Sequence, residues 1–315
     1  MKQIRSALAR LCMQLLCLLL GIILAAMLGI TVYTQYHLNK IQPSASAPTA
    51  GFIEAVSLSD EVPDSATPLV HVLLIGQDAR EGEAGSRSDS IMLCTYNAQS
   101  QKLFFTSFLR DLYVPIPGHG SNRINAAYAF GGRKLLKQTI EENFQLKIDG
   151  TVEVDFSQFS EIIDLLGGVC ITLRADEANV INEETGSQLT EGAQTLNGQQ
   201  ALAYARIRKL DSDGDFSRTS RQRMVMQAIL DSYRNAGTGK ILRLVYSLLP
   251  MISTDMDPGQ ILALAVSAVP SLSQITFVSQ HVPAIGEYQD QFIDGMSVLV
   301  PNLEQCTKTL RNSFR

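Results

Sequence analysis

The stretch VHVLLIG at residues 70–76 is an apolar run that ends at a glycine. Two similar runs follow it, SIMLCTYN at residues 90–97 and KLFFTSF at residues 102–108, and a short polar turn joins these two. Apolar runs of this length, bounded by turn residues, are typical of buried β-strands. The three runs therefore predict that the folded part of the chain begins with a β-sheet.

Beyond this sheet, helical and strand patterns alternate. Helices are expected at residues 124–130 and 133–144 (separated by Gly131-Gly132), 156–166, 198–205 (capped by Asn197), 216–235, 240–252 and 258–269. Strands are expected at residues 150–155, 169–173, 275–278 and 297–300. This alternation predicts an α/β fold in which helices sandwich a mixed central β-sheet, and residues 69–315 are interpreted as one domain.

The N-terminal part differs in character. Residues 11–33 carry no charge and are long enough to cross a bilayer, whereas residues 1–10 contain Lys2, Arg5 and Arg10. This asymmetry predicts a single transmembrane anchor with residues 1–10 in the cytoplasm and everything after the anchor outside. Residues 34–68 are expected to form an extracytoplasmic stalk. The competing interpretation is a signal peptide cleaved at Ala45-Ser46-Ala47, but the apolar run is longer than a signal core.

Composition excludes several classes of function. The chain has 315 residues and a formal net charge of -5, which argues against a nucleic-acid-binding protein. Its four histidines lack metal-ligand spacing, and no G-x-S-x-G elbow or complete P-loop is present. The sequence DSDGD at residues 211–215 resembles a calcium loop, but its glycine stands at the wrong position.

The five cysteines indicate no disulfide framework or metal site. Cys12 and Cys17 fall in the expected anchor, and an odd number of three remains outside it. Cys94, Cys170 and Cys306 are expected to be buried free thiols. A bridge between Cys94 and Cys170 would require their two strands to be neighbours.

Two aspartates stand at strand ends. Asp78 follows the first strand and Asp89 precedes the second, a position where α/β proteins usually bind ligands. Carboxylates without nearby histidine or thiolate are suited to Mg²⁺ or Mn²⁺. The alternative is that Asp78 turns the loop and Asp89 caps it. Arg110 ends another strand and is expected at the same rim, unless it only pairs with Asp111.

Residues 204–223 read YARIRKLDSDGDFSRTSRQR and gather many of the chain's arginines. On a helix, Arg218, Arg221 and Gln222 share a face with the apolar residues Val225, Ala228 and Ile229, whereas Arg223 and Gln227 point elsewhere. Because the apolar end of that face must lie against the core, its first turns are expected to aim Arg218, Arg221 and Gln222 into a cleft.

Inward-facing arginines need an anion. Arg206 and Arg208 are two residues apart, so an extended chain would point both toward the same cleft. Part of the charge can be neutralised by Asp213 and Asp215 in ordinary salt bridges. Guanidinium groups bind phosphate or carboxylate bidentately, and a divalent cation beside several arginines is the chemistry of a diphosphate site.

Seven motifs carry a family resemblance. They are LLIGQDAR…SRSDS, SFLRDLYVPIPG, RINAAYAFGG, IDGTVEVDF, LLGGVCITL, LNGQQALAYARIR and DGDFSRTSRQR, in this order. The sequence resembles the LytR–CpsA–Psr (LCP) family in these motifs and in the single expected anchor. Several long motifs in the family's order are a more specific signal than any one of them.

The resemblance implies an extracytoplasmic, membrane-anchored phosphotransferase. Such enzymes move a glycopolymer (teichoic acid, capsule or a related glycan) from a polyprenyl diphosphate carrier to the 6-hydroxyl of N-acetylmuramic acid in peptidoglycan. By motif position, Asp78 and Asp89 resemble the Mg²⁺ ligands. The residues that resemble the diphosphate-binding and catalytic groups are Arg110, Arg206, Arg208 and Arg218, supported by Asp215 and Gln222, with Arg80 and Arg221 near the same motifs. Asp215 is a candidate for orienting or deprotonating the acceptor hydroxyl.

Small departures from the family pattern remove no charged site residue. Gln77 and Ala79 stand where small hydroxyl residues are common, and Leu109 stands where proline is common. Two other functions stay open on the sequence alone. The same site could hydrolyse polyprenyl diphosphates, or the protein could bind wall lipids as a non-catalytic regulator.

Overall fold

The computed structural model describes residues 69–77, 88–261, 264 and 272–315. The expected anchor at residues 11–33, the stalk, Asp78, Arg80 and part of the helix expected at residues 258–269 lie outside the described residues. In the part of the chain that the structure describes, no helix is both long and apolar enough to cross a membrane.

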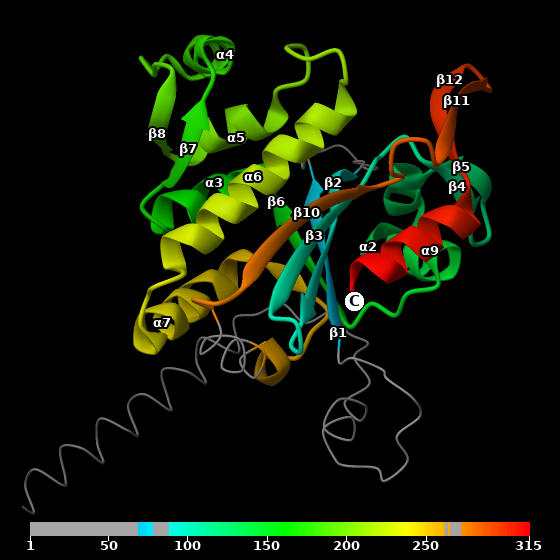
Figure 1. The fold of residues 1–315 in the computed structure, drawn as a ribbon, viewed down its shortest axis with the longest axis horizontal. Helices are drawn as coiled ribbons and strands as arrows, with labels where there is room; N and C mark the ends of the chain where they lie inside the picture. Colours follow the sequence, from blue (N-terminus) through cyan, green and yellow to red (C-terminus); the bar gives the residue numbers. More distant parts are fainter. Residues whose placement is uncertain (1–68, 78–87, 262–263, 265–271) are drawn as a thin grey trace, which may run out of the picture.

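A six-stranded mixed sheet forms the centre of the molecule (Figure 1). Its order is β10 (Thr276–Val282), β3 (Lys102–Phe108), β2 (Ser88–Asn97), β1 (Leu69–Gln77), β6 (Gly150–Asp155) and β9 (Ser253–Thr254). The pairs β1–β2, β2–β3 and β6–β9 are antiparallel, whereas β1–β6 and β3–β10 are parallel. The three runs quoted first are strands, and the predicted pairing of the second with the third is present; the structure adds that the first run pairs with the second.

Helices cover both faces of this sheet (Figure 1). On one side lie α2 (Ile124–Phe144) and α9 (Leu303–Ser313), and on the other lie α3 (Phe156–Leu165), α5 (Gly198–Arg206) and α6 (Asp215–Tyr233). Beyond α5 lie α4 (Ala175–Thr185) and a hairpin of β7 (Val169–Leu173) and β8 (Gly192–Leu196), while α7 (Thr238–Leu248) lies near one end of α6. The mixed α/β sandwich expected from the sequence is present.

Each face of the sheet has its own packing. Leu73, Ile75 and Leu93 are at most 2% exposed and belong to the apolar core under α2 and α9. Leu74, Met92 and Val152 stand at one register across β1, β2 and β6 and face α3, α5 and α6. Because side chains alternate along a strand, one sheet supplies both a closed core and the wall of a cavity.

Local signals explain the helix boundaries near this cavity. The Asn197 side chain accepts a hydrogen bond from the Gln200 N–H and caps α5 as predicted. The next residue must be glycine, since a Cβ on Gly198 would lie 2.1 Å from the Ser160 carbonyl oxygen of α3. The predicted break at Gly131-Gly132 is a kink inside α2, where both glycines have non-helical torsions.

Several short elements escaped the sequence prediction: β4 (Tyr113–Ile116), β5 (Gly120–Arg123), α4, β8, β9 and β11 (Tyr288–Ile293), together with α9. The strand expected at residues 275–278 is longer, and the strand at residues 297–300 is β12 (Met296–Pro301), which pairs only with β11 among the described strands. Most of these elements are short, two-stranded or largely polar, so they carry little periodic signal. Helix α9 is different, because buried Cys306 and Leu310 stand at helical spacing that the sequence prediction missed. All three described cysteines are free, and Cys170 is exposed rather than buried, because its strand belongs to a separate hairpin.

Candidate functional site

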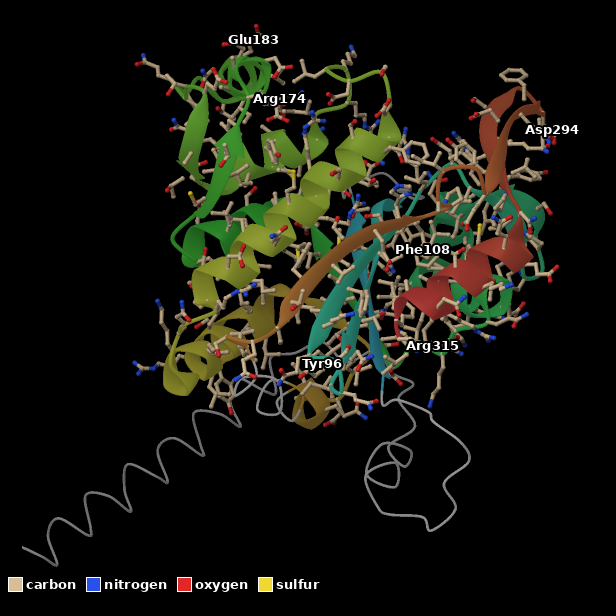
Figure 2. All side chains as sticks on the ribbon, viewed as in Figure 1. Tyr96, Phe108, Arg174, Glu183, Asp294 and Arg315 are labelled. Carbon is tan, nitrogen blue, oxygen red and sulfur yellow. The ribbon has the colours of Figure 1, made fainter. Side chains whose placement is uncertain are left out.

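A cavity of about 850 Å³ lies between the central sheet and helices α3, α5 and α6. Its inner wall is apolar, with Leu74, Met92, Val152 and Val154 from the sheet and Phe159, Ile162, Met226 and Ile229 from the helices. Its charged lining residues are Asp89, Asp155, Arg110, Arg206, Arg208, Lys209, Arg218, Glu183 and Glu184. In Figure 2, Glu183 lies at the end of the molecule opposite Tyr96. Tyr96 is near the last residue of β2, so Ser88 and Asp89, which begin this strand, lie toward the same end as Glu183. The cavity thus joins a charged mouth to an apolar interior.

Three arginines meet at the mouth around one carboxylate. The Arg110 Nη1 lies 3.3 Å from Asp89 Oδ1, the Arg208 Nη2 lies 3.4 Å from it, and the Arg218 Nη1 lies 4.0 Å from it. They come from the end of β3, the loop after α5 and the first turn of α6. The sequence prediction that these arginines converge with Asp89 agrees with this geometry.

Arg218 is the most deeply buried of them, with 1% of its surface exposed. Its three guanidinium nitrogens have no hydrogen-bond partner among the described residues, although Nη2 lies 2.5 Å from Asp215 Oδ1. The pKa of Arg218 is lowered to about 10, chiefly by burial; the Asp215 and Asp89 charges raise it, and the Arg208 and Arg110 charges lower it. A buried guanidinium with unsatisfied donors has the chemistry of an anion site.

Asp215 and Gln222 complete the polar end of α6. Asp215 begins the helix, and its Oδ1 also lies 3.6 Å from Arg110 Nε. Gln222 lies one turn beyond Arg218 and accepts a hydrogen bond of 3.0 Å from the Ser90 hydroxyl. Both side chains therefore hold α6 against β2 and β3 at the mouth.

Arg206 lines the same cavity but does not join the cluster around Asp89. Its Nη1 lies 3.4 Å from Glu184 Oε1 of α4, and its guanidinium stands 5.0 Å from the centre of the Phe156 ring. The ion pair is half-exposed, with 43% of the Arg206 side chain and 48% of the Glu184 side chain accessible. Arg206, which was expected to bind substrate, thus forms an ion pair with a carboxylate of this chain.

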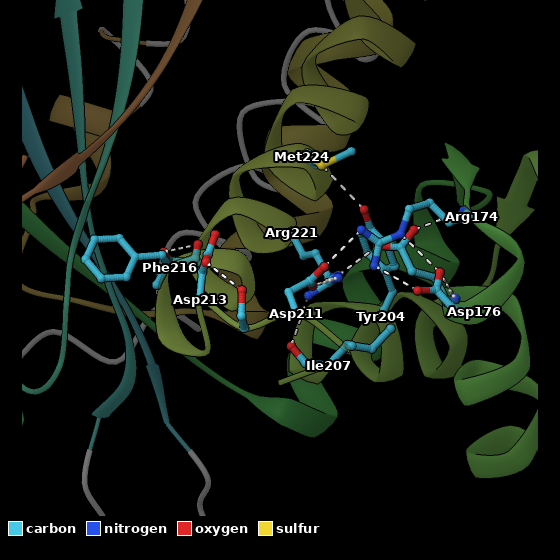
Figure 3. A network of polar contacts seen from close by, with 12 residues as sticks. Arg174, Asp176, Tyr204, Ile207, Asp211, Asp213, Phe216, Arg221 and Met224 are labelled. Carbon is cyan, nitrogen blue, oxygen red and sulfur yellow. Dashed lines mark hydrogen bonds and ion pairs between the residues drawn. The ribbon is translucent and has the colours of Figure 1, made fainter. Parts of the chain in front are cut away.

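Arg221 does not enter the cavity, so its predicted place beside Arg218 is wrong. Its side chain points toward α4 and the loop after α5, where it contacts Glu177 and Asp211 (Figure 3). The helical face predicted from spacing was too wide, because the 100° step between Arg221 and Gln222 is enough to separate two neighbouring environments.

Arg223 is also buried, with 4% of its surface exposed, although the sequence pattern placed it away from the buried face. It donates hydrogen bonds to the Ser279 and Ser107 hydroxyls of β10 and β3. The reason is that α6 is covered on several sides, by the sheet as well as by α5 and β7.

The expected metal site is described only in part, because Asp78 lies outside the described residues. The described residues contain no group of three or more His, Cys, Asp or Glu side chains placed to hold a metal ion. Of the two aspartates predicted to hold the metal, only Asp89 is described, and its carboxylate lies at the mouth. Mg²⁺ is commonly held by one or two carboxylates together with substrate phosphates, so a single described carboxylate fits a metal that arrives with a diphosphate.

Sequence reasoning missed the acidic partners Glu177, Asp211 and Glu184. Two of them lie on α4, a helix that was not predicted, although Asp176 and Glu177 in its first turn and Gly186 at its end are ordinary boundary signals. Asp211 stands among the arginines of residues 204–223, in the sequence that resembles a calcium loop, but nothing local indicates that it pairs with Arg221 and Arg174.

Comparisons with known proteins agree with this geometry. The profile of the LytR_cpsA_psr family matches residues 32–313. Over 218 residues the chain is 36% identical to a polyisoprenyl-teichoic acid–peptidoglycan teichoic acid transferase, TagU of Oceanobacillus iheyensis, covering 66% of this chain and 65% of TagU. Over 162 residues it is 40% identical to the regulatory protein MsrR of Staphylococcus aureus strain Mu50, covering 51% of this chain and 48% of MsrR. The matched region is thus less than two thirds of either relative.

A solved structure resembles the fold over most of its length. The LytR-CPS2A-psr family protein YwtF (TagT) with bound octaprenyl pyrophosphate lipid superposes with a TM-score of 0.60 at 26% identity, covering 81% of this chain and 94% of that one.

Proposed function

The chain belongs to the LytR_cpsA_psr family, and from this premise we propose that it is a phosphotransferase that moves a glycopolymer from a polyprenyl diphosphate carrier to peptidoglycan. The single observation that carries the proposal is the cavity. Its interior is apolar, as a prenyl chain requires, and its mouth holds a cluster of arginines. The names of TagU and of the lipid-bound TagT structure support the same substrate class.

The chemistry of the mouth suits a diphosphate. Arg110, Arg208 and Arg218 would bind the phosphate oxygens, and the charge they supply stabilises the polyprenyl phosphate as it leaves. Arg218 has the largest share in this, because its guanidinium is buried and, apart from ion-pair contacts with Asp215 and Asp89, has no hydrogen-bond partner among the described residues. Mg²⁺, held at Asp89 and the phosphates when bound, would supply further neutralisation of the diphosphate.

Asp215 is the carboxylate placed to orient an incoming hydroxyl. It stands at the first residue of α6, between Arg218 and Arg110. The proposed acceptor is the 6-hydroxyl of N-acetylmuramic acid, whose oxygen would attack the phosphorus bonded to the glycan. The phosphoryl–oxygen bond to the prenyl phosphate then breaks, and the hydroxyl proton passes to a base.

The proposal includes a location. Residues 11–33 would anchor the chain in the cell membrane, with residues 69–315 outside the cytoplasm. Strand β1 starts at Leu69 and runs toward Gly76, which lines the cavity.

Full-length protein in detergent, incubated with a prenyl-diphosphate-linked glycan, peptidoglycan and Mg²⁺, tests the proposal. Mass spectrometry should detect glycan joined through a phosphodiester to muramic acid, and the product should disappear with EDTA. Release of free glycan phosphate alone would instead identify a hydrolase. Tight lipid binding without any product would identify a non-catalytic regulator.

A further inference from the structure

A chain of ion pairs links α6 to α4 and to the loop after α5 (Figure 3). The Arg221 Nε donates to Glu177 Oε1 at 2.9 Å, and its Nη2 donates to Asp211 Oδ2. The other oxygen of Asp211 accepts from Arg174 Nη1 at 3.0 Å. Arg174 and Glu177 begin α4, where the Glu177 side chain also accepts from the Arg174 N–H.

Arg221 binds both ends of the segment that carries Arg208. Besides Asp211, its Nη1 donates to the Ile207 carbonyl oxygen at 3.4 Å. Ile207 is buried and directly precedes Arg208, and Asp211 comes three residues after Arg208. One guanidinium, 4% exposed, therefore fixes the chain on each side of an arginine that is itself half-exposed.

The contacts of Arg221 restrict the position of the backbone around Arg208. Arg221 is a planar fork whose three nitrogens each have an acceptor, and this arrangement cannot be reproduced by a lysine. Arg221 and Arg174 hold the pKa of Asp211 below its usual range. Arg208, by contrast, has a long side chain and only one ionic contact, with Asp89, among the described residues. Its position depends on where the backbone of residues 207–211 is held.

We propose that Arg221 is a positioning residue for the phosphotransfer site: its contacts with Ile207 and Asp211 hold the 207–211 segment so that Arg208 reaches the mouth of the cavity beside Asp89. This inference rests on the proposed function for its effect on catalysis, but the ordering of the segment is a property of the protein without substrate.

The same helix offers a matched control. Arg223 is as buried as Arg221, at 4% exposure, but it contacts Ser107 and Ser279 of the sheet and not the 207–211 segment. Loss of either arginine removes a buried guanidinium from α6. Only loss of Arg221 should release Arg208.

The first experiment needs no activity. Amide hydrogen exchange of the full-length protein in detergent would be compared for wild type, Arg221→Lys, Asp211→Asn and Arg223→Lys. Exchange in residues 208–214 should rise by about tenfold in the first two variants and stay unchanged in Arg223→Lys, because local opening follows the contacts that are lost. Asp211→Asn leaves the Arg221–Glu177 pair intact. If Arg221→Lys fails to fold, the exchange of residues 208–214 in Asp211→Asn therefore tests the inference. Unchanged exchange in both variants overturns the inference.

The second experiment is a double-mutant cycle on transfer rates. Arg221→Lys alone should lower kcat/KM by about tenfold, since small displacements of a positioning group have effects of that order or larger. In an Arg208→Ala background the same substitution should have less than about a twofold effect, because coupled residues are not additive. Arg223→Lys should have the same effect in both backgrounds.

The two experiments separate the two claims. Additive losses for Arg221→Lys and Arg208→Ala would overturn the positioning role even if the protein is a transferase. A wild-type protein without transfer activity would overturn the proposed function, while the exchange result would still decide whether Arg221 orders the segment.

Discussion

Replacement of Arg218 by methionine separates binding chemistry from stability, because the structure predicts different consequences for the two. Arg218 is 1% exposed, and none of its guanidinium nitrogens has a hydrogen-bond partner among the described residues. Methionine keeps a long, unbranched side chain in the same space and removes the charge. We expect transfer to be lost while the fold is retained.

The expected size of each effect follows from the site. Loss of one preorganised donor to a developing anion typically lowers kcat by about 10²–10³. In the absence of ligand, burial lowers the pKa of Arg218 from 12.5 to about 10, which corresponds to about 3 kcal/mol by which the native state disfavours its charge. This net value already contains the attraction of Asp215, and Arg110 stays near that carboxylate in the variant. Removal of the Arg218 charge should therefore leave the free energy of unfolding unchanged or raise it, by no more than about 3 kcal/mol.

Three measurements on full-length protein check this prediction. Urea denaturation gives the free energy of unfolding, and transfer kinetics give kcat/KM. Thermal melting with geranylgeranyl diphosphate reports binding, because a ligand at a hundredfold excess over its Kd stabilises wild type by about 2.7 kcal/mol. Arg218→Met should lose most of that stabilisation. Arg234→Met is the control, since Arg234 ends α6 away from the cavity and pairs with Asp231.

Two results would refute the reasoning. Undiminished transfer by Arg218→Met would show that its unsatisfied donors do not contact the reacting diphosphate. A loss of several kcal/mol of stability, with transfer reduced only in proportion to the unfolded fraction, would show that Arg218 is a structural residue.

Other features of the molecule lead to three further predictions. Glu184→Gln should free Arg206 and lower the KM for the prenyl diphosphate donor by up to about fivefold, the limit for an exposed ion pair; an equal effect of Glu183→Gln would indicate general electrostatics instead. Burial lowers the pKa of His71 below its ordinary 6.5, opposed by Asp149, so the unfolded state binds more protons and stability falls as pH drops through 6.5. The free energy of unfolding would be measured at pH 7.5 and pH 5.5, about one unit either side of the ordinary histidine pKa. The decrease between these two pH values should be smaller in His71→Asn than in wild type, and equal decreases would contradict the assignment. Among the described cysteines, exposed Cys170 should react rapidly with a thiol reagent. Cys94 and Cys306 should react slowly, because burial raises the pKa of each thiol to about 12. A fast phase that persists in Cys170→Ser would be inconsistent with this.

The sequence was most informative where a periodic apolar pattern meets a polar residue. The runs at residues 70–76, 90–97 and 102–108 predicted strands because apolar runs bounded by turn residues are typical of buried strands, and the short turn between the last two runs predicted that these two pair. Arg218 and Gln222 were placed in a cleft because they continue the apolar face of a helix. Both predictions rest on local geometry, which a sequence encodes directly.

The partner of each charged side chain was less predictable. Nothing local pairs Arg221 with Glu177, which lies 44 residues earlier, or Arg206 with Glu184. The prediction counted arginines and nearby aspartates only within residues 204–223, whereas two of the decisive carboxylates come from α4. Long-range ion pairs depend on tertiary packing, so helical spacing could give the direction of Arg221 only to within one helical step.

The balance of charge explains why carboxylates stand among the arginines at the mouth. Arg110, Arg208 and Arg218 would repel one another in an empty cavity, and Asp89 and Asp215 lie among them and offset that repulsion. These carboxylates also fix the guanidinium groups before a ligand arrives, so less reorganisation is needed on binding. Asp89 is a common partner of the three arginines, and it is also the described carboxylate suited to a divalent cation. A cation at Asp89 would weaken its hold on Arg110 and Arg208 and leave their donors for phosphate oxygens. In this account metal and arginines depend on each other, and the Arg221 contacts keep Arg208 close enough for that exchange.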